Sequence, residues 1–331
     1  MRFGTAWRAA WVLAALLAAF PIAAQGVKPD TAPLSARSAD FVWMEGEVRE
    51  GPVLVVVSLD AQRAYVYRGA ARIAVSNVST GRPGFETPQG VYTVLEKRRE
   101  HYSNLYDDAP MPFMQRLTWG GLALHAGALP GRPASHGCIR LPYAFAEKLF
   151  GVTSRDTTIV IARAADDPAS TASTPISSVS ASDAASLPYT WTPDAAHGGP
   201  LAIVYSTHDR EVVVLRGASE IGRATVDLVG ESRPGRHVFW LLSGARTEAS
   251  VVVPGRPALR WLEISLEPEG GDREIRLADA SGAGTIRVNE AFARVVYDIL
   301  EPGTVLLITD APLQSMGNAI TPSVLSAERT R

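Results

Sequence analysis

The sequence contains a single cysteine, Cys138, in 331 residues. One cysteine excludes an intramolecular disulfide, so this thiol is an inert buried side chain, an intermolecular partner or a reactive nucleophile. Exported proteins usually hold their cysteines in pairs, which makes an unpaired one informative. Two histidines lie near it in the sequence, His125 and His136, and their proximity favours the nucleophile.

An excess of charge of either sign is also lacking. The chain has 32 lysines and arginines against 34 aspartates and glutamates, which gives a formal net charge of -2. Without a basic stripe, nucleic-acid binding is not expected. Hydrophobic residues make up 46% and charged residues 20%, as in a globular protein with real cores, and the length allows two domains or one large one.

One long apolar run lies at the N-terminus, over residues 11–24, and the basic residues Arg2 and Arg8 precede it. Together with a cleavage site at Ile22-Ala23-Ala24, before Gln25, this pattern predicts a signal peptide over residues 1–24. The run is short for a membrane span, so an uncleaved N-terminal anchor is the less favoured alternative. Either form places the rest of the chain outside the cytoplasm, in the periplasm or cell envelope.

Short apolar segments separated by glycine and proline turns predict a mainly β sandwich or barrel domain over residues 45–163. Proline suits the first turn of a helix, so a short helix is expected at residues 142–149. The strand at residues 122–124 ends directly before His125. The expected strands cover residues 53–57, 64–67, 73–75, 91–95, 122–124 and 158–161.

Two segments have the composition of flexible chain. Residues 164–198 are rich in alanine, serine, threonine, proline and aspartate and have few large apolar residues, which predicts a linker. The C-terminal tail, residues 312–331, has the same character. The segment between them, residues 199–311, returns to the strand pattern of the first domain.

The segment 199–311 repeats words of the first domain in the same order. Residues 57–70 and 205–218 share a serine near the start and an arginine-glycine-alanine turn at the end, in one register. Residues 140–146 likewise align with 287–293, and both continue without a gap to an apolar strand. Self-similarity at a fixed offset predicts a duplicated β domain. The alternative is that two unrelated β segments share short words by chance.

The second copy has lost the reactive groups. Residues 135–138 fall on 282–285, where only the glycine is kept. We therefore predict that residues 199–311 form a catalytically dead repeat of the same fold. Features that both copies keep are interpreted as scaffold, and by that reasoning Arg140, which matches Arg287, is largely structural.

The chemistry of the first domain is assigned to a thiol and its neighbours. A cysteine attacks as the thiolate, and an unperturbed thiol has a pKa of about 8.5, so a base is needed. His125 is the predicted base for Cys138. His136 is expected to orient the site or to contribute to an oxyanion pocket, and Gly137 allows close approach of the backbone. Ser135 is expected to hydrogen-bond within the loop.

Other interpretations of these residues stay open. A histidine such as His125, taken alone, is more often a satisfied side chain at a strand end, and a free cysteine is often a small buried hydrophobe. A metal site would combine His101, His125, His136 and Cys138. The spacings typical of zinc ligands are absent, however, so neither a metal nor a cofactor is expected.

The motif around the cysteine is similar to that of a known family. Residues 135–141 read SHGCIRL and follow an upstream histidine, His125, a combination that resembles the L,D-transpeptidase catalytic domain, or YkuD family, of bacterial cell walls. Residues 79–81 (STG) and 87–90 (TPQG) support the resemblance, which covers residues 52–163. It implies an L,D-transpeptidase-type β-sandwich with short helices.

The resemblance also implies a reaction. Cysteine in this family attacks a peptidoglycan stem peptide after its L-centre diamino acid, D-alanine leaves, and an amine acceptor resolves the thioester. Carried over, Cys138 is the nucleophile, His125 the general base, and His136 with Gly137 the orienting and oxyanion loop. Glycine, serine or threonine commonly follows the histidine in the family, whereas Ala126 follows it here. A backbone carbonyl near this point can orient the histidine in the family, and the third member of the triad stays unassigned.

Residues 96–119 form an insert rich in aromatic residues and methionine, and it precedes the strand that leads to His125. Such an insert is equally consistent with a substrate lid and with a loop that covers the core. The residues predicted to contact the stem peptide are Tyr106, Met114, Trp119, Ser135 and Arg140.

Three functions compete. The leading one is a cysteine transpeptidase that forms peptidoglycan crosslinks, with donor and acceptor stem peptides as its partners. A thiol hydrolase with the same nucleophile and base would act as a carboxypeptidase or endopeptidase, or release a wall-anchored protein. A non-enzymatic wall-binding module is the third, since fold alone does not choose among them. The second unit is expected to contact wall or envelope proteins, or to dock on the first unit and shape its groove.

Overall fold

The computed structural model describes residues 40–44, 50–103, 108–164, 170–173, 186–229, 235–250, 253–266 and 285–316. The predicted signal peptide, Tyr106, much of the predicted linker and the last part of the predicted tail lie outside these ranges. We call residues 40–164 the first unit and residues 170–316 the second unit. Within the described ranges, no helix is long and apolar enough to cross a membrane.

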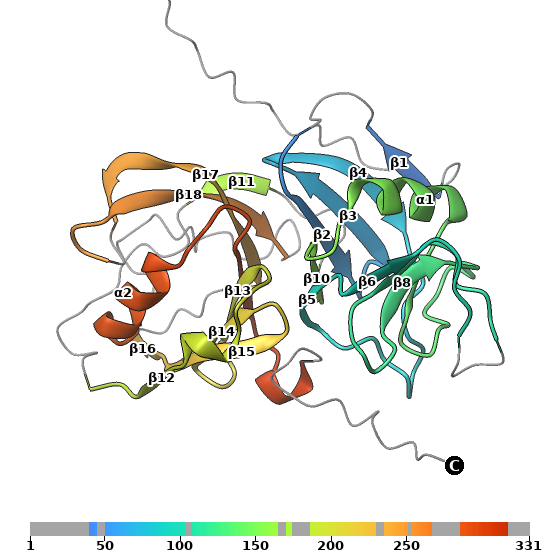
Figure 1. Ribbon diagram of the computed structural model, residues 1–331. Helices are drawn as coiled ribbons and strands as arrows, with labels where there is room; N and C mark the ends of the chain where they lie inside the picture. The colour runs from blue at the N-terminus through green and yellow to red at the C-terminus, as the bar shows by residue number, and fades with distance from the viewer. Residues whose placement is uncertain are drawn as a thin grey trace, which may run out of the picture.

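The first unit is built on a six-stranded sheet with the order β1-β4-β3-β2-β10-β5 (Figure 1). Strands β2 and β10 pair in parallel, and the other neighbouring pairs are antiparallel. The sequences of these two strands are uninterrupted apolar runs because both faces of the sheet are buried there. The strands are β1 (Phe41–Trp43), β2 (Val53–Ser58), β3 (Arg63–Arg68), β4 (Ala71–Asn77), β5 (Gly90–Thr93) and β10 (Thr158–Ala162).

A smaller four-stranded sheet carries the predicted catalytic histidine. Its strands are β6 (Glu96–Arg98), β7 (Met114–Arg116), β8 (Ala123–Ala126) and β9 (Ile139–Leu141), and helix α1 (Tyr143–Val152) follows. Strands β8 and β9 run parallel, with His125 opposite Arg140. A hydrophobic core that includes Val55, Phe113 and Phe145 fills the space between the large sheet, the small sheet and the helix.

The second unit is built on an eight-stranded sheet with the order β11-β18-β17-β20-β13-β14-β15-β12. A separate core, which includes Phe239 and Phe292, packs one face of this sheet against helix α2 (Glu290–Asp298). The strands are β11 (Ser170–Ser173), β12 (Tyr189–Trp191), β13 (Leu201–Ser206), β14 (Glu211–Arg216), β15 (Ser219–Thr225), β17 (His237–Ala249), β18 (Pro257–Ser265) and β20 (Val305–Thr309). The remaining elements are the paired strands β16 (Asp227–Val229) and β19 (Thr285–Arg287) and the 3-10 turns η1 (Pro193–Ala195) and η2 (Leu313–Ser315).

Two parts of the predicted linker, residues 164–198, are strands. Strand β11 pairs with β18, and β12 pairs with β15, each in antiparallel fashion. Trp191 of β12 lies edge-on to Phe292 of α2, with ring centroids 6.0 Å apart. The composition of residues 164–198 did not predict this contact, because the contact involves one aromatic side chain among many small residues.

The two units share backbone detail as well as strand order. In each, the first strand of an antiparallel hairpin, β2 or β13, pairs in parallel with the last strand, β10 or β20. A third strand, β4 or β15, follows the hairpin and pairs with its second strand. The first turn contains a non-glycine residue with positive φ in both, Gln62 at 50° and Arg210 at 55°. The second turn contains a glycine with positive φ in both, Gly69 at 56° and Gly217 at 58°.

The large sheets of the two units share one hydrophobic core. Side chains alternate along a strand, so that Val55 points into the core of the first unit while Leu54 and Val56 point the other way. There they meet Val204 and Trp240 of the second unit in a continuous buried cluster. The second unit therefore covers the face of the first sheet opposite to the small sheet and α1 (Figure 1).

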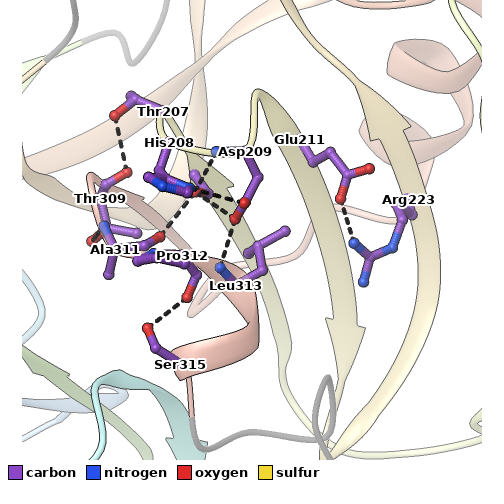
Figure 2. A network of polar contacts seen from close by, with 11 residues as sticks. Thr207, His208, Asp209, Glu211, Arg223, Thr309, Ala311, Pro312, Leu313 and Ser315 are labelled. Atoms are coloured by element: carbon purple, nitrogen blue, oxygen red, sulfur yellow. Dashed lines mark hydrogen bonds and ion pairs between the residues drawn. The ribbon is translucent and has the colours of Figure 1, made fainter.

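A polar network fastens the C-terminal part of the second unit to the tip of the β13–β14 hairpin (Figure 2). Asp209 accepts a hydrogen bond from the backbone N–H of Leu313 at 2.6 Å. The Ser206 hydroxyl donates to the carbonyl of Ala311 at 2.9 Å. Since Leu313 and Met316 are buried in the shared core, this network holds η2 against the contact between the units.

Candidate active site

Strands β8 and β9 bring the two predicted catalytic residues to one pocket. His125 lies in β8, and Cys138 immediately precedes β9, its parallel neighbour. Both line a pocket of about 530 Å³, together with His136, Arg140 and other residues of the first unit. All the lining residues among those described come from the segment 101–143, so the second unit contributes none of them.

A backbone carbonyl orients the ring of His125. Its Nδ1 lies 2.8 Å from the carbonyl oxygen of Ala126. A carbonyl only accepts, so Nδ1 carries the proton and donates it, and Nε2 keeps a free lone pair. This backbone carbonyl is the partner of His125 that the sequence left unassigned.

His125 is neutral at neutral pH. The side chain is buried, and this burial lowers the pKa of His125 to about 4. The hydrogen bond to Ala126 opposes the shift, while the charges of Arg140 and His101 add to it. A neutral imidazole with a free Nε2 is the form that accepts a proton.

The thiol of Cys138 is also neutral at rest. Burial raises the pKa of the thiol, although a backbone hydrogen bond from Ala123 and the charges of Arg140 and Arg116 lower it in part. The sulfur donates to the carbonyl oxygen of Gly121 at 3.3 Å. The pocket therefore contains a protonated thiol and a neutral imidazole.

The loop before the cysteine is held by its own serine. The Ser135 hydroxyl donates to the carbonyl of Cys138 at 2.5 Å and accepts from the N–H of Gly137 at 3.1 Å. Thr87 donates to the carbonyl of Gly137 at 2.6 Å. Gly137 has a φ of 112°, a conformation that favours glycine. Ser135, predicted to contact substrate, lines the pocket but uses its hydroxyl within the loop.

The segment 79–87 braces the catalytic loop from the side. Ser79 forms an isolated bridge with Arg140, and Gly81 forms one with Ser135. A Cβ on Gly81 would lie 1.9 Å from the carbonyl oxygen of Phe85, so only glycine fits there. The STG and TPQG words therefore have a structural role, because both contact the loop that carries Cys138.

His136 is fixed by two residues that sequence reasoning missed. Arg82 Nη2 lies 2.8 Å from His136 Nε2, and a guanidinium only donates, so Nε2 accepts. The ring of Phe85 lies edge-on to His136 with centroids 4.8 Å apart. Arg82 in turn stacks on the Phe85 ring at 4.6 Å. In the sequence, Arg82 and Phe85 lie between the STG and TPQG words. This position alone does not indicate that they contact His136.

The predicted substrate contacts in the insert separate into two groups. Met114 is fully buried against Met111, Ala123 and Cys138, and it lines the pocket. Trp119 is 75% exposed and is not among the lining residues. The insert as a whole contributes β6 and β7 and buries Phe113 in the core, so much of it covers the core as one alternative proposed.

The residues considered for a metal site do not form one in the described part of the chain. His101 lines the pocket, and burial lowers its pKa. No group of three or more histidine, cysteine, aspartate or glutamate side chains that could hold a metal ion is found among the described residues.

Comparison with known proteins agrees with this site. Residues 52–161 match the family model of the YkuD L,D-transpeptidase catalytic domain. The match covers about a third of the chain, contains both Cys138 and His125, and confirms the family resemblance of the first unit. None of the curated proteins is significantly similar to the chain in sequence.

Several solved L,D-transpeptidases are similar to the chain in structure. One from Mycobacterium tuberculosis H37Rv is 27% identical, with 34% of this chain and 57% of that chain covered and a TM-score of 0.33. One from Mycobacterium smegmatis is 26% identical, with 33% and 58% covered and a TM-score of 0.31. One from Stackebrandtia nassauensis is 26% identical, with 35% and 58% covered and a TM-score of 0.32. The chain thus spans less than two thirds of the length of each, and the assignment of residues 52–161 rests on the family model.

Proposed function

We propose that this chain is a cysteine L,D-transpeptidase that forms peptidoglycan crosslinks through an acyl-enzyme on Cys138. The observation that carries the proposal is that Cys138 and His125, whose Nδ1 is held by a backbone carbonyl, line one pocket of the matched domain. The N-terminal pattern of the sequence supports export, which would place the enzyme with its substrate in the periplasm or cell envelope.

In the proposed reaction, His125 Nε2 takes the proton of Cys138 as the sulfur attacks the carbonyl carbon at the L-centre of the diamino acid. The C–N bond to the terminal D-residue breaks, and the imidazole passes the proton of the thiol to the leaving amine. A thioester remains on Cys138. An acceptor amine then attacks it and gives its proton to His125, which returns the proton to the sulfur as the C–S bond breaks.

The second unit is, in our proposal, a degenerate copy of the first that stabilises it. The matched turns at Gln62 and Arg210 and at Gly69 and Gly217 support a duplication. Its contact with the large sheet, away from the pocket, favours a scaffold over the alternative that it shapes the groove. Contact with wall or envelope proteins through its other surfaces remains a separate proposal.

The test is incubation of the purified chain with tetrapeptide muropeptides, followed by mass spectrometry. Crosslinked dimers and a mass adduct on Cys138 are expected, and both should be absent from the Cys138→Ala variant. The Cys138→Ser variant serves as a matched control, since it keeps the shape of the side chain and lacks the thiol. Shortened stems without dimers would replace the transpeptidase with the hydrolase, and no product with no adduct would favour the binding module.

A further inference from the structure

Arg140 is an unpaired cation in the wall of the pocket. Among the described residues, its guanidinium has neither an ion pair nor a hydrogen-bond partner, although the side chain is partly buried and lines the pocket. The other lining arginine, Arg116, is paired with Glu96 at 2.9 Å. The described lining contains no aspartate or glutamate. The positive charge of Arg140 is therefore uncompensated in the pocket, and it can bind a negatively charged group there.

The position of Arg140 is fixed on both sides of its backbone. Its N–H donates to the carbonyl of Ser79 at 2.9 Å, and its carbonyl accepts from the N–H of Ser79 at 3.0 Å. The aliphatic part of its side chain lies over Gly127, where a Cβ would be 3.1 Å from Arg140 Cγ. A glycine at 127 thus leaves room for the stem of the arginine. This anchoring limits the freedom that binding a ligand would remove.

Arg140 also lies close to the reacting atoms. It faces His125 across the β8–β9 pair and is two residues from Cys138. Its charge lowers the pKa of both side chains, which agrees with that proximity. An anion bound by Arg140 must therefore sit near the scissile bond.

We propose that Arg140 binds the chain-terminal carboxylate of the amino acid that leaves. This inference rests on the proposed transpeptidase function and adds to it a specificity for the free acid. In a stem peptide that ends one residue after the scissile bond, this carboxylate is attached to the carbon next to the leaving nitrogen. The second carboxyl of the diamino acid lies at the far end of a side chain, and so is much farther from the attacked carbonyl.

Arg140 contacts the carboxylate during the first half of the reaction, the acylation of Cys138. Cys138 Sγ bonds to the carbonyl carbon, the C–N bond breaks, and the proton from the thiol passes through His125 to the leaving nitrogen. The carboxylate stays paired to Arg140 while the C–N bond breaks, and the free amino acid then dissociates from Arg140 and leaves the pocket. An arginine suits this task because its planar fork donates two hydrogen bonds to one carboxylate.

The experiment compares two donors that produce the same acyl-enzyme. One is a tetrapeptide muropeptide that ends in free D-alanine, and the other is the same compound that ends in D-alaninamide. The rate of the Cys138 adduct is followed by mass spectrometry in the wild type, Arg140→Met and Arg140→Lys. The matched control is Arg132→Met, which removes the same charge from an exposed residue outside the described lining.

We expect the Arg140→Met variant to acylate about 10- to 100-fold more slowly with the free acid, as for loss of a hydrogen-bonded ion pair. With the amide, the wild type should fall to the rate of that variant. Arg140→Lys should lie between them, because it keeps the charge and loses the fork. Arg132→Met should behave as the wild type with both donors.

Two results would overturn the inference. One is a wild type that acylates equally fast with acid and amide, and the other is an Arg140→Met variant that keeps the preference for the acid. In both, the adduct still forms, so the proposed function survives. Absence of an adduct with either donor in the wild type would instead reject the transpeptidase itself.

Discussion

Acidification tests the electrostatics of His125 most directly. Burial lowers the pKa of His125 from 6.5 to about 4, so the base stays neutral well below the pH at which an exposed histidine would be protonated. The acid limb of the acylation rate should therefore lie near pH 4 to 5. If the base titrated as an exposed histidine does, the rate would already fall below pH 6.5.

The same shift links protonation to stability. The folded-state pKa lies below the unfolded value, so the folded state binds fewer protons at His125 than the unfolded state does between the two values. The contribution is fully present above pH 6.5 and is lost as the pH falls through about 4. The shift corresponds to about 3 kcal/mol of unfolding free energy.

The assay is urea unfolding of the wild type and His125→Gln at intervals from pH 7.5 to pH 4. We expect the wild type to lose about 3 kcal/mol more over this range than the variant, which has no imidazole to protonate at this position. Parallel stability curves for the two proteins, or an acid limb of the acylation rate near pH 6.5, would refute the assignment of a buried, neutral base.

Three further predictions concern other parts of the chain. Iodoacetamide should alkylate Cys138 at pH 7 more slowly than free cysteine, because burial raises the pKa of the thiol. The alkylation rate is measured by mass spectrometry, and a rate faster than that of free cysteine would indicate a resting thiolate. The Arg82→Met variant should acylate about tenfold more slowly at an unchanged melting temperature, because His136 loses its donor; an unchanged rate would remove Arg82 from the site. The Asp209→Ala variant should lose about 1–2 kcal/mol of unfolding free energy in urea, since a backbone N–H loses its acceptor, and the exposed Asp310→Ala should lose little; equal losses would contradict the network.

The elements that the sequence predicted best are those with a local signal. The apolar run at residues 53–57 lies in β2, and residues 158–161 lie in β10. The helix expected at residues 142–149 is α1, which covers Tyr143–Val152 with Pro142 at its N-cap. The presence of His125 and Cys138 in one pocket was predictable. Cys138 belongs to the motif at residues 135–141, and His125 is the histidine upstream of that motif. The family model covers the same region.

What the sequence did not reveal depends on contacts between distant or backbone groups. The partner of His125 is a carbonyl, which every residue has, so no residue type marks it. Arg82 and His136 are 54 positions apart, and their contact depends on how the segment 79–87 lies against the catalytic loop. The strand β12 lies in the predicted linker, because its packing depends on two aromatic side chains, Tyr189 and Trp191, in a segment of mostly small and polar residues.

The shared core has a practical consequence for anyone who shortens this chain. The family match ends at residue 161, so a shortened protein would naturally end there. One face of the large sheet of the first unit is, however, buried against residues of the second unit, which lie beyond that point. A fragment that stops at this boundary would present Leu54, Val56 and Tyr65 to water as one flat apolar surface. Such a fragment should self-associate, so the smallest well-behaved piece of this protein includes both units.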